Sequence, residues 1–327
     1  MEALSEFELI DRFFRRPTRH AVLGVGDDAA LLAPTPGCEL AVSVDMLVAG
    51  RHFFADVDPE ALGHKALAVN LSDMAAMGAS PRWVLLAGAL PNADAAWVGA
   101  FARGFFALAD AYGVDLVGGD TTKGPLNLCV TILGEVPAGQ ALRRRGARPG
   151  DAVFVSGRLG DAALALAHHR HRVILAADEL AQCERALLRP APRVELGERL
   201  RGIATAAIDV SDGLVGDLGH ILDASGVSAT LELAALPRSA ILNQRLAGDE
   251  RGLALDCQLA GGDDYELCFT APARAAADIG TLAEQLDLAL TRIGGIEERG
   301  GLLVRDENGQ ALRTLPAAFD HFRGSGS

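Results

Sequence analysis

The chain has 327 residues, which is more than a single hydrophobic core usually organises, so we expect two domains. Half of the residues are hydrophobic, and a sizeable buried core is therefore possible. The formal net charge of −13 argues against a nucleic acid or an anionic membrane as a partner held by bulk charge. An anionic ligand would need cations beside it, and a divalent metal ion is the natural candidate.

Cysteine usage and the N-terminal residues both predict a cytoplasmic protein without a membrane partner. The five cysteines form no Cys-x-x-Cys pair and most lie within apolar runs, so we expect reduced, buried thiols. No apolar run approaches the length of a membrane span. Residues 1–14 form an acidic, amphipathic helical pattern that lacks the basic and apolar regions of a signal peptide.

The first half of the chain predicts alternating helices and strands, which is typical of a layered α/β or α+β domain. Helices are expected at residues 5–16, at 59–77 after the strong Asp58-Pro59 start, and from an Asn92 cap to about residue 112. Strands are expected at residues 40–44, 83–90, 114–117 and 126–136. The first strand would deliver Asp45 at its end, and the third would lead into Gly118-Gly119-Asp120.

A stretch rich in Pro, Gly and Arg at residues 137–151 marks the expected domain boundary. We predict an N-terminal domain at residues 1–138, a C-terminal α/β domain at 149–323 and a flexible Gly-Ser tail at 324–327. In the second domain, strands are expected at 152–156, 206–209, 265–270 and 302–304, and helices from residue 161, at 213–224 and at 272–286.

Aspartates recur where an apolar run ends or the chain turns. They lie in GVGDDAAL, SVDML, NLSDMAAMG, GGDTTKG and IDVSDGL, which contain Asp28, Asp45, Asp73, Asp120, Asp209 and Asp212. Each alone has a structural explanation as a turn residue, a helix cap or a surface charge. As a set, with Ser43 nearby, these hard oxygen ligands suit Mg²⁺ better than a His or Cys cluster would. We expect them to converge on one metal–phosphate site.

Two common nucleotide motifs do not fit the chain, and its basic residues leave alternatives open. The GVGDDA loop is unlike a dinucleotide-binding loop, because two carboxylates fall where a pyrophosphate would bind. No GxxxxGK[ST] motif occurs.

The arginines at 143–145 are either a solvated loop or a bidentate phosphate clamp. His52 is structural by default, and the histidines at 168, 169 and 171 are expected at the surface, with no acid at ligand spacing.

Six segments, in order along the chain, resemble the thiamine-monophosphate kinases. They are GVGDDAAL, SVDMLVAGRHF, HKALAVNLSDMAAMGA, LVGGDTTKGP, AIDVSDGLVGDLGHI and GGDDYELCF, and the resemblance extends from about Glu6 to Phe322. That family belongs to the superfamily of aminoimidazole-ribonucleotide synthetase, selenophosphate synthetase and a hydrogenase-maturation protein. The resemblance implies an N-terminal ATP- and Mg²⁺-binding domain whose sheet pairs across a homodimer into a β-barrel, and a C-terminal α/β domain.

The reaction implied by the resemblance is direct in-line transfer of the ATP γ-phosphate to thiamine monophosphate, which gives thiamine diphosphate. Donor and acceptor are both anionic, so several Mg²⁺ ions must cancel their repulsion, and catalysis is mostly positioning and charge neutralisation. Because the acceptor is already an ionised phosphate, no general base is required.

The resemblance also implies roles for individual residues. The metal ligands would be Asp28, Ser43, Val44 through its carbonyl, Asp45, Asp73, Asp120, Asp209 and Asp212, with Asp120 and Asp212 as the catalytic carboxylates. ATP would contact Gly119, Asp120, Arg144 and Ser211, and thiamine monophosphate would contact His52, Asp263 and Phe319. The family often has Glu in place of Asp263 and Tyr or Trp in place of Phe319, so here the carboxylate reaches one methylene less far and the ring has no hydroxyl.

Other interpretations stay open at this point. Another ATP-dependent synthetase of the superfamily would phosphorylate an amide or selenide. Selenophosphate synthetase should carry a reactive Cys in an N-terminal Gly-rich loop, and no Cys precedes Cys38; the hydrogenase-maturation protein should end in Cys, and none follows Cys268. A non-catalytic metal- and nucleotide-binding dimer would keep the aspartates without turnover.

Overall fold

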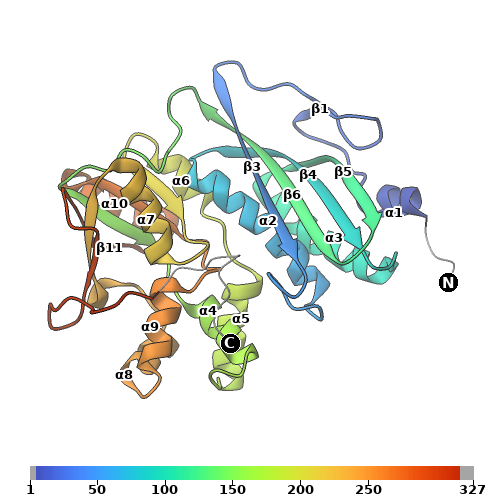
Figure 1. The fold of residues 1–327 in the computed structure, drawn as a ribbon. Coiled ribbons are helices and arrows are strands. Elements are labelled where there is room, and N and C mark those ends of the chain that lie inside the picture. Colours follow the sequence, from blue (N-terminus) through green and yellow to red (C-terminus); the bar gives the residue numbers. More distant parts are fainter. Residues whose placement is uncertain (1–4, 317–327) are drawn as a thin grey trace. The chain divides into compact units, whose positions relative to one another are not determined.

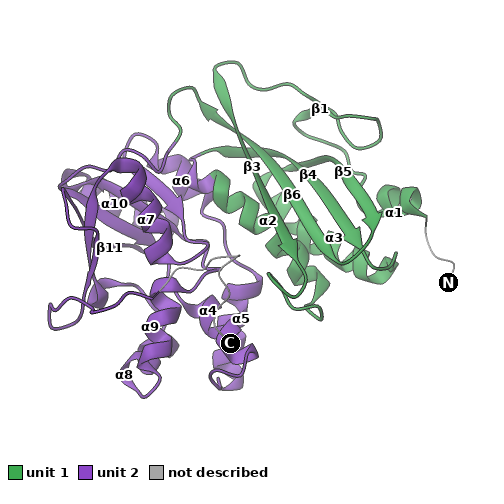
Figure 2. Cartoon of the chain, viewed as in Figure 1, with its two compact units in different colours: residues 1–74, 79–141 green, residues 75–78, 142–327 purple. Residues whose placement is uncertain are grey.

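The computed structural model describes residues 5–316, and the chain divides into two units (Figure 2). Unit 1 comprises residues 1–74 and 79–141, and unit 2 comprises residues 75–78 and 142–327. Phe319 and the predicted tail at residues 324–327 lie outside the described residues. Both units combine helices with a β-sheet (Figure 1), which confirms the predicted α/β (α+β) class.

Unit 1 is built on a four-stranded sheet in the order β3-β6-β4-β5. Strands β3 (Cys38–Val48), β6 (Asn127–Pro137) and β4 (Ser80–Leu90) pair antiparallel, and β5 (Asp115–Lys123) adds parallel to β4. Helices α2 (Pro59–Ala76) and α3 (Ala95–Tyr112) cover one face of this sheet (Figure 1). Alternate residues of β6, such as Val130 and Ile132, are buried, as the two-residue period of a strand requires.

The helices of unit 1 begin and end close to the predicted residues. The carboxylate of Asp58 accepts the N–H of Ala61 (2.9 Å), and α2 follows with Pro59 at its first position. The predicted cap of α3 is wrong: Asp94, and not Asn92, accepts the N–H groups of the first turn. A further helix, α1 (Glu6–Phe13), opens the unit with a capping box formed by Ser5 and Glu8.

A small antiparallel pair, β1 (Ala21–Leu23) and β2 (Leu31–Leu32), flanks the GVGDDAAL loop and was not predicted. Two buried carboxylates anchor this segment at its ends. Asp115 accepts the N–H groups of residues 19, 20 and 21 at 2.7, 2.5 and 3.3 Å. Glu135 accepts the N–H (2.5 Å) and the hydroxyl (2.9 Å) of Thr35. The acidic loop therefore lies between two fixed points of unit 1.

Unit 2 contains a six-stranded sheet in the order β12-β9-β11-β7-β10-β8, in which only the β12–β9 pair is parallel. Its strands are β7 (Asp151–Ser156), β8 (Ala206–Asp209), β9 (Ser228–Glu232), β10 (Leu267–Pro272), β11 (Leu290–Glu297) and β12 (Leu302–Arg305). Its helices are α4 (Asp161–His169), α5 (Ala177–Leu188), α6 (Val194–Leu200), α7 (Leu214–Ser225), α8 (Ala240–Ala247), α9 (Arg251–Ala260) and α10 (Ala276–Leu286). Aliphatic side chains of α7 and the sheet share one core, and α4, α5, α8 and α9 share a second.

Several predicted boundaries are wrong in ways that matter for the site. β3 continues through Asp45, and β5 continues through Gly119 and Asp120, so both carboxylates lie inside strands and not after them. Pro272 ends β10, and α10 begins only after a short 3₁₀ turn. Strands β9 and β11 and helices α8 and α9 were not predicted. Within residues 5–316, no helix is both long enough and apolar enough to cross a membrane.

Candidate functional site

Two of the predicted metal ligands of unit 1 meet in the structure. The hydroxyl of Ser43, on β3, donates a hydrogen bond to the carboxylate of Asp73, on α2. Ser43 therefore faces the helix-covered side of the sheet, and Asp45, two residues along β3, faces the same side and is half-buried. Val44 lies between them with its side chain exposed on the other side. A hydroxyl and two carboxylates supply the hard oxygen donors that Mg²⁺ prefers.

Asp120 is also a predicted ligand, but it lies on β5, at the opposite edge of the same sheet from β3. In the sheet register, Asp45 pairs with Val130, Val130 pairs with Leu86, and Leu86 pairs with Gly119, which is the residue before Asp120. Three strand spacings separate the two edges, or about 14 Å. One ion cannot contact both carboxylates of the same chain across that distance.

Gly119 is required where β5 approaches β4. Its φ of 153° is one that residues with a side chain rarely adopt. A Cβ atom at this position would lie 1.8 Å from the carbonyl oxygen of Leu86, which belongs to the neighbouring strand. The glycine thus keeps the backbone before Asp120 close to β4. Both Gly119 and Asp120 are predicted ATP contacts, and Gly119 places no side chain next to Asp120.

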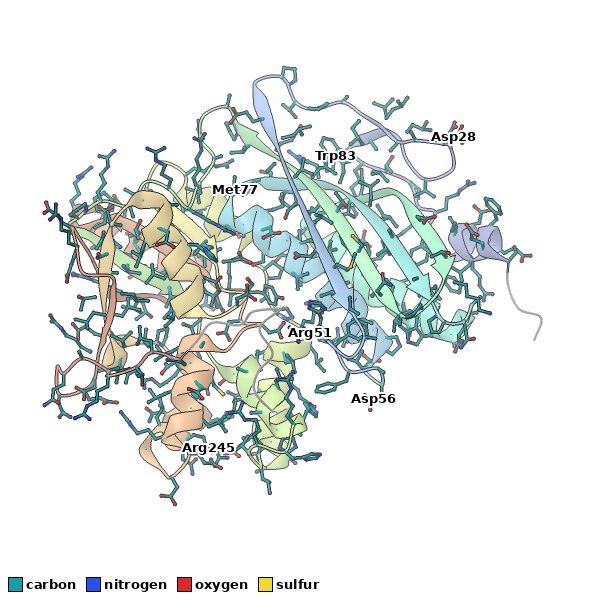
Figure 3. All side chains as sticks on the ribbon, in the orientation of Figure 1. Asp28, Arg51, Asp56, Met77, Trp83 and Arg245 are labelled. Atoms are coloured by element: carbon teal, nitrogen blue, oxygen red, sulfur yellow. The ribbon has the colours of Figure 1, made fainter. Side chains whose placement is uncertain are left out.

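His52 and Asp28 both lie in turns of unit 1. The Nδ1 atom of His52 accepts the N–H of Val48 (3.0 Å), so the neutral ring carries its proton on Nε2. Asp28 is exposed on the loop after β1, as Figure 3 shows. Its N–H donates to the carboxylate of Asp27 (2.8 Å), so the side chain of Asp27 orders the turn.

In unit 2, two predicted motifs interlock through their backbones. Asp209 ends β8 at the predicted residue and is 6% exposed. The loop that follows it accepts two hydrogen bonds from the GGDDYE segment: Tyr265 N–H donates to the Val210 carbonyl (2.8 Å) and Asp263 N–H to the Ser211 carbonyl (2.9 Å). A Cβ atom on Gly262 would lie 2.4 Å from the Ser211 oxygen, so only glycine permits this contact. The structure therefore brings Ser211, a predicted ATP contact, next to Asp263, a predicted substrate contact.

The GGDDYE segment holds two residues in the left-handed region of the backbone map. Asp263 has a φ of 68° and Tyr265 a φ of 49°, a conformation that costs about 1–3 kcal/mol for residues other than glycine. The hydroxyl of Tyr265 donates to the carboxylate of Asp263 (3.3 Å). Strained residues that persist in this way are concentrated at ligand-binding sites.

The remaining acids of this segment are structural. Asp264 accepts the N–H of Gly160 at the start of α4 (2.9 Å), and burial raises the pKa of its carboxyl well above the ordinary value. Glu266 accepts hydrogen bonds from the Ser156 hydroxyl (2.5 Å) and from the Nε atom of Arg193 (2.6 Å). These two carboxylates fix the segment to the body of unit 2.

A residue that the sequence analysis missed is Asp217, in the first turn of α7. Its buried carboxylate accepts the N–H groups of Ser211, Asp212 and Gly213. Burial raises the pKa of Asp217 to about 7, and the nearby charge of Asp209 adds to this effect. The available signal was an acid among apolar residues of a helix that directly follows a candidate metal loop.

The arginines at 143–145 are exposed, and their backbone runs along the edge strand β8. The Arg143 carbonyl accepts the N–H of Ala207 (3.0 Å), and the Arg144 carbonyl accepts the hydroxyl of Ser225 (3.2 Å). Glu184 of α5 lies 2.8 Å from Nε2 of His169, a contact between neighbouring helices that the spacing of residues in the sequence does not reveal.

The predicted magnesium ligands are divided between the two units: six belong to unit 1, and Asp209 and Asp212 belong to unit 2. Among residues 5–316, no three His, Cys, Asp or Glu side chains lie close enough together to hold a metal ion. The complete ligand set and its roles thus stay a prediction, supported locally by the Ser43–Asp73 contact and by the acidic surroundings of Asp209.

Comparison with known proteins extends over both units. Residues 26–136 match the N-terminal domain of AIR synthase related proteins, and residues 148–307 match the C-terminal domain. Thiamine-monophosphate kinase of Salmonella typhimurium is 45% identical over 326 residues, which cover 98% of this chain and 99% of that protein.

Two solved structures are similar over nearly the whole chain. Thiamine-monophosphate kinase from Stenotrophomonas maltophilia K279a has 49% identity and a TM-score of 0.85, and the match covers 94% of this chain and 98% of that one. A structure of AaThiL complexed with AMPPCP and TMP has 30% identity and a TM-score of 0.76, with 97% of each chain covered. The chain therefore belongs to the AIR synthase related family and, within it, to the thiamine-monophosphate kinases.

Proposed function

We propose that this protein transfers the γ-phosphate of ATP directly to thiamine monophosphate and releases thiamine diphosphate. The interlocked loops of unit 2 carry this proposal, because they bring the predicted ATP contact Ser211 and the predicted substrate contact Asp263 together. The relative complexed with AMPPCP and TMP supports the same pair of ligands. His52 and Phe319 complete the proposed substrate site, and Gly119 and Arg144 the proposed ATP site.

We assign Mg²⁺ to the oxygen-rich ligand set, in which Asp120 and Asp212 are the proposed catalytic carboxylates. When bound, Mg²⁺ neutralises the charge of the two phosphates that must approach each other. Since Asp45 and Asp120 of one chain are about 14 Å apart by strand spacing, the set requires more than one ion or ligands from a second chain. The proposed ligands are Asp28, Ser43, the carbonyl of Val44, Asp45, Asp73, Asp120, Asp209 and Asp212.

A homodimer is the proposed assembly. The edge strand β3 exposes a row of large apolar side chains, which are Leu40, Val42, Val44 and Met46, at 44–61%. An exposed apolar edge strand favours pairing with another chain, and pairing with a second copy would cover this row. The five free thiols support a reducing compartment, and we propose the cytoplasm.

A direct assay tests the proposed reaction. The purified protein is incubated with ATP, Mg²⁺ and thiamine monophosphate, and thiamine diphosphate and ADP are quantified chromatographically. We expect the two products in equal amounts, and no phosphorylation when unphosphorylated thiamine or selenide replaces thiamine monophosphate. Binding of Mg²⁺ and ATP without thiamine diphosphate formation would show that the chain is a non-catalytic relative.

A further inference from the structure

Asp217 holds the loop that carries Ser211 and Asp212 by an unusual contact. A single oxygen, Oδ2, accepts the N–H groups of Ser211 (3.0 Å), Asp212 (3.1 Å) and Gly213 (3.1 Å). The side chain is only 3% exposed. Three successive N–H groups reach one oxygen only when the three peptide planes turn around it, so the carboxylate determines the curvature of the loop.

Capping of the first turn of α7 does not explain this arrangement, because the three N–H donors, at residues 211–213, all precede Leu214, the first residue of the helix. A buried carboxylate is costly to desolvate, and the acidic Asp209 lies close enough to oppose its charge. The N-cap residue itself is Gly213, where a φ of 112° and the backbone of Ala260, 2.6 Å from a Cβ atom, exclude a side chain. A carboxylate oxygen is, however, a strong acceptor for several N–H donors at once.

The opposite side of the same loop is fixed by different contacts. The carbonyls of Val210 and Ser211 accept the N–H groups of Tyr265 and Asp263. The N–H groups of the loop are thus held by Asp217, and its carbonyls are held by the GGDDYE segment. A change in the position of Ser211 is therefore transmitted through one hydrogen bond to the backbone of Asp263.

We propose that Asp217 is a positioning residue of the phosphoryl-transfer site, which holds Ser211 and Asp212 in the geometry that binds Mg²⁺ and ATP. This inference rests on the proposed kinase function. Asp217 acts through the backbone of the loop and contacts neither substrate itself.

The test compares Asp217→Asn with wild type and with Asp223→Asn, which removes a charge from an exposed position on the same helix. Amide hydrogen exchange of the ligand-free protein is expected to accelerate at residues 211–213 in D217N alone. Calorimetric titration with Mg²⁺ and AMPPCP is expected to show at least about tenfold weaker binding, because an amide oxygen holds the three N–H groups less tightly than a carboxylate oxygen does. In kinetics, KM for ATP and the Mg²⁺ concentration for half-maximal rate should rise, and the melting temperature should stay near that of wild type.

Two results would overturn the inference. One is wild-type binding of Mg²⁺ and AMPPCP by D217N; the other is accelerated exchange throughout unit 2 with a matching fall in melting temperature, which would show a merely structural role. If D217N does not fold, Asp217→Glu decides, since it keeps the charge and displaces the oxygen by one methylene: weaker binding supports the inference and unchanged binding contradicts it. A wild-type protein that makes no thiamine diphosphate would refute the proposed function, whereas the exchange and binding measurements would still test the role of Asp217.

Discussion

Ser43 and Asp73 are joined by a hydrogen bond that links β3 to α2, across 30 positions of sequence. Asp73 is half-buried in a helix whose neighbouring residues Leu71 and Met74 are fully buried. A carboxylate in such surroundings is costly unless it is paired or bound to a cation. Ser43 supplies one of the contacts of this carboxylate, and the pairing of a hydroxyl with a carboxylate, both hard oxygen donors, is the reason for placing a metal ion here.

Asp73→Asn is accordingly expected to lower kcat by about 100-fold or more, because one charged ligand is lost where charge neutralisation dominates catalysis. Its melting temperature should stay close to that of wild type, since the isosteric amide keeps the shape of the side chain and its oxygen can still accept the Ser43 hydroxyl. Initial rates over a Mg²⁺ titration, together with thermal melts, measure both effects. Asp56→Asn, at an exposed position of the same unit (Figure 3), is the control and should behave as wild type. Unchanged Mg²⁺ dependence in D73N would remove Asp73 from the metal site.

Asp120→Asn separates catalysis from folding at the other edge of the sheet. Asp120 is exposed, so its substitution should change the free energy of unfolding by less than about 0.5 kcal/mol. Because Asp120 is a proposed catalytic carboxylate, kcat should nevertheless collapse. Steady-state rates and urea unfolding of the same preparation measure the two quantities. Turnover close to that of wild type would exclude Asp120 from the metal set.

The adjacent glycines of β5 provide a matched pair of variants. Gly119→Ala places a Cβ atom 1.8 Å from a backbone oxygen at a φ of 153°, so we expect a loss of about 1–3 kcal/mol in the free energy of unfolding. Gly118→Ala meets only a leucine methyl group at 3.7 Å, an ordinary contact, and should change stability by less than about 1 kcal/mol. Urea unfolding of both variants tests the contrast. Equal effects would show that the close approach of β5 to β4 is not specific to Gly119.

The cysteines differ in accessibility, contrary to the expectation that all are buried. Cys38 and Cys129 are half-buried, and burial raises the pKa of Cys183 and of Cys257 to about 12. Since the thiolate is the reactive form, a thiol reagent at pH 8 should modify no more than two cysteines of the native protein and all five after unfolding. Mass spectrometry of the labelled peptides identifies them. Rapid labelling of Cys183 or Cys257 in the native protein would contradict the described packing.

Local signals in the sequence predicted those parts of the fold that depend on neighbouring residues. Asp58-Pro59 predicts the start of α2, and its predicted end at residue 77 lies one residue beyond the observed end at Ala76. The apolar run before Asp209 predicts β8. The sequence pattern instead ends the strand at residue 117, before Gly118-Gly119-Asp120. In the structure, partners on β4 keep residues 118–120 in a strand, and that pairing is not visible in a local pattern.

The candidate site likewise has features that the local sequence reveals and features that only the fold determines. The residue types and their order pointed to the Asp set, and the contact of Ser43 with Asp73 agrees with that prediction. The role of Asp217 was missed because its contacts are to backbone N–H groups, which leave no sequence signature in the residues that donate them. The interlocking of Ser211 with Asp263 depends on the sheet register of β8 and β10, which only the fold determines.

Glu135 provides a pH-dependent prediction away from the proposed metal ligands. Burial alone would raise the pKa of this 5% exposed carboxyl, but hydrogen bonds from Thr35 and the charge of Arg82 outweigh burial and lower the pKa below its ordinary value of 4.5. A lowered pKa in the folded state means that the ionised carboxylate stabilises the fold at pH values above 4.5. That contribution is lost as the pH falls from about 4.5 through the lower folded-state pKa.

Glu135→Gln should therefore reduce the free energy of unfolding at pH 7, because a neutral amide replaces the ionised acceptor beside Thr35 and Arg82. The difference from wild type should shrink as the pH falls below 4.5, because Glu135 is then protonated first in the unfolded state and, at lower pH, in the folded state as well. Urea unfolding of both proteins at pH 7, 5 and 4 measures that difference directly. A difference that stays constant or widens toward pH 4 would show that the ionised carboxylate of Glu135 does not anchor the segment after β2.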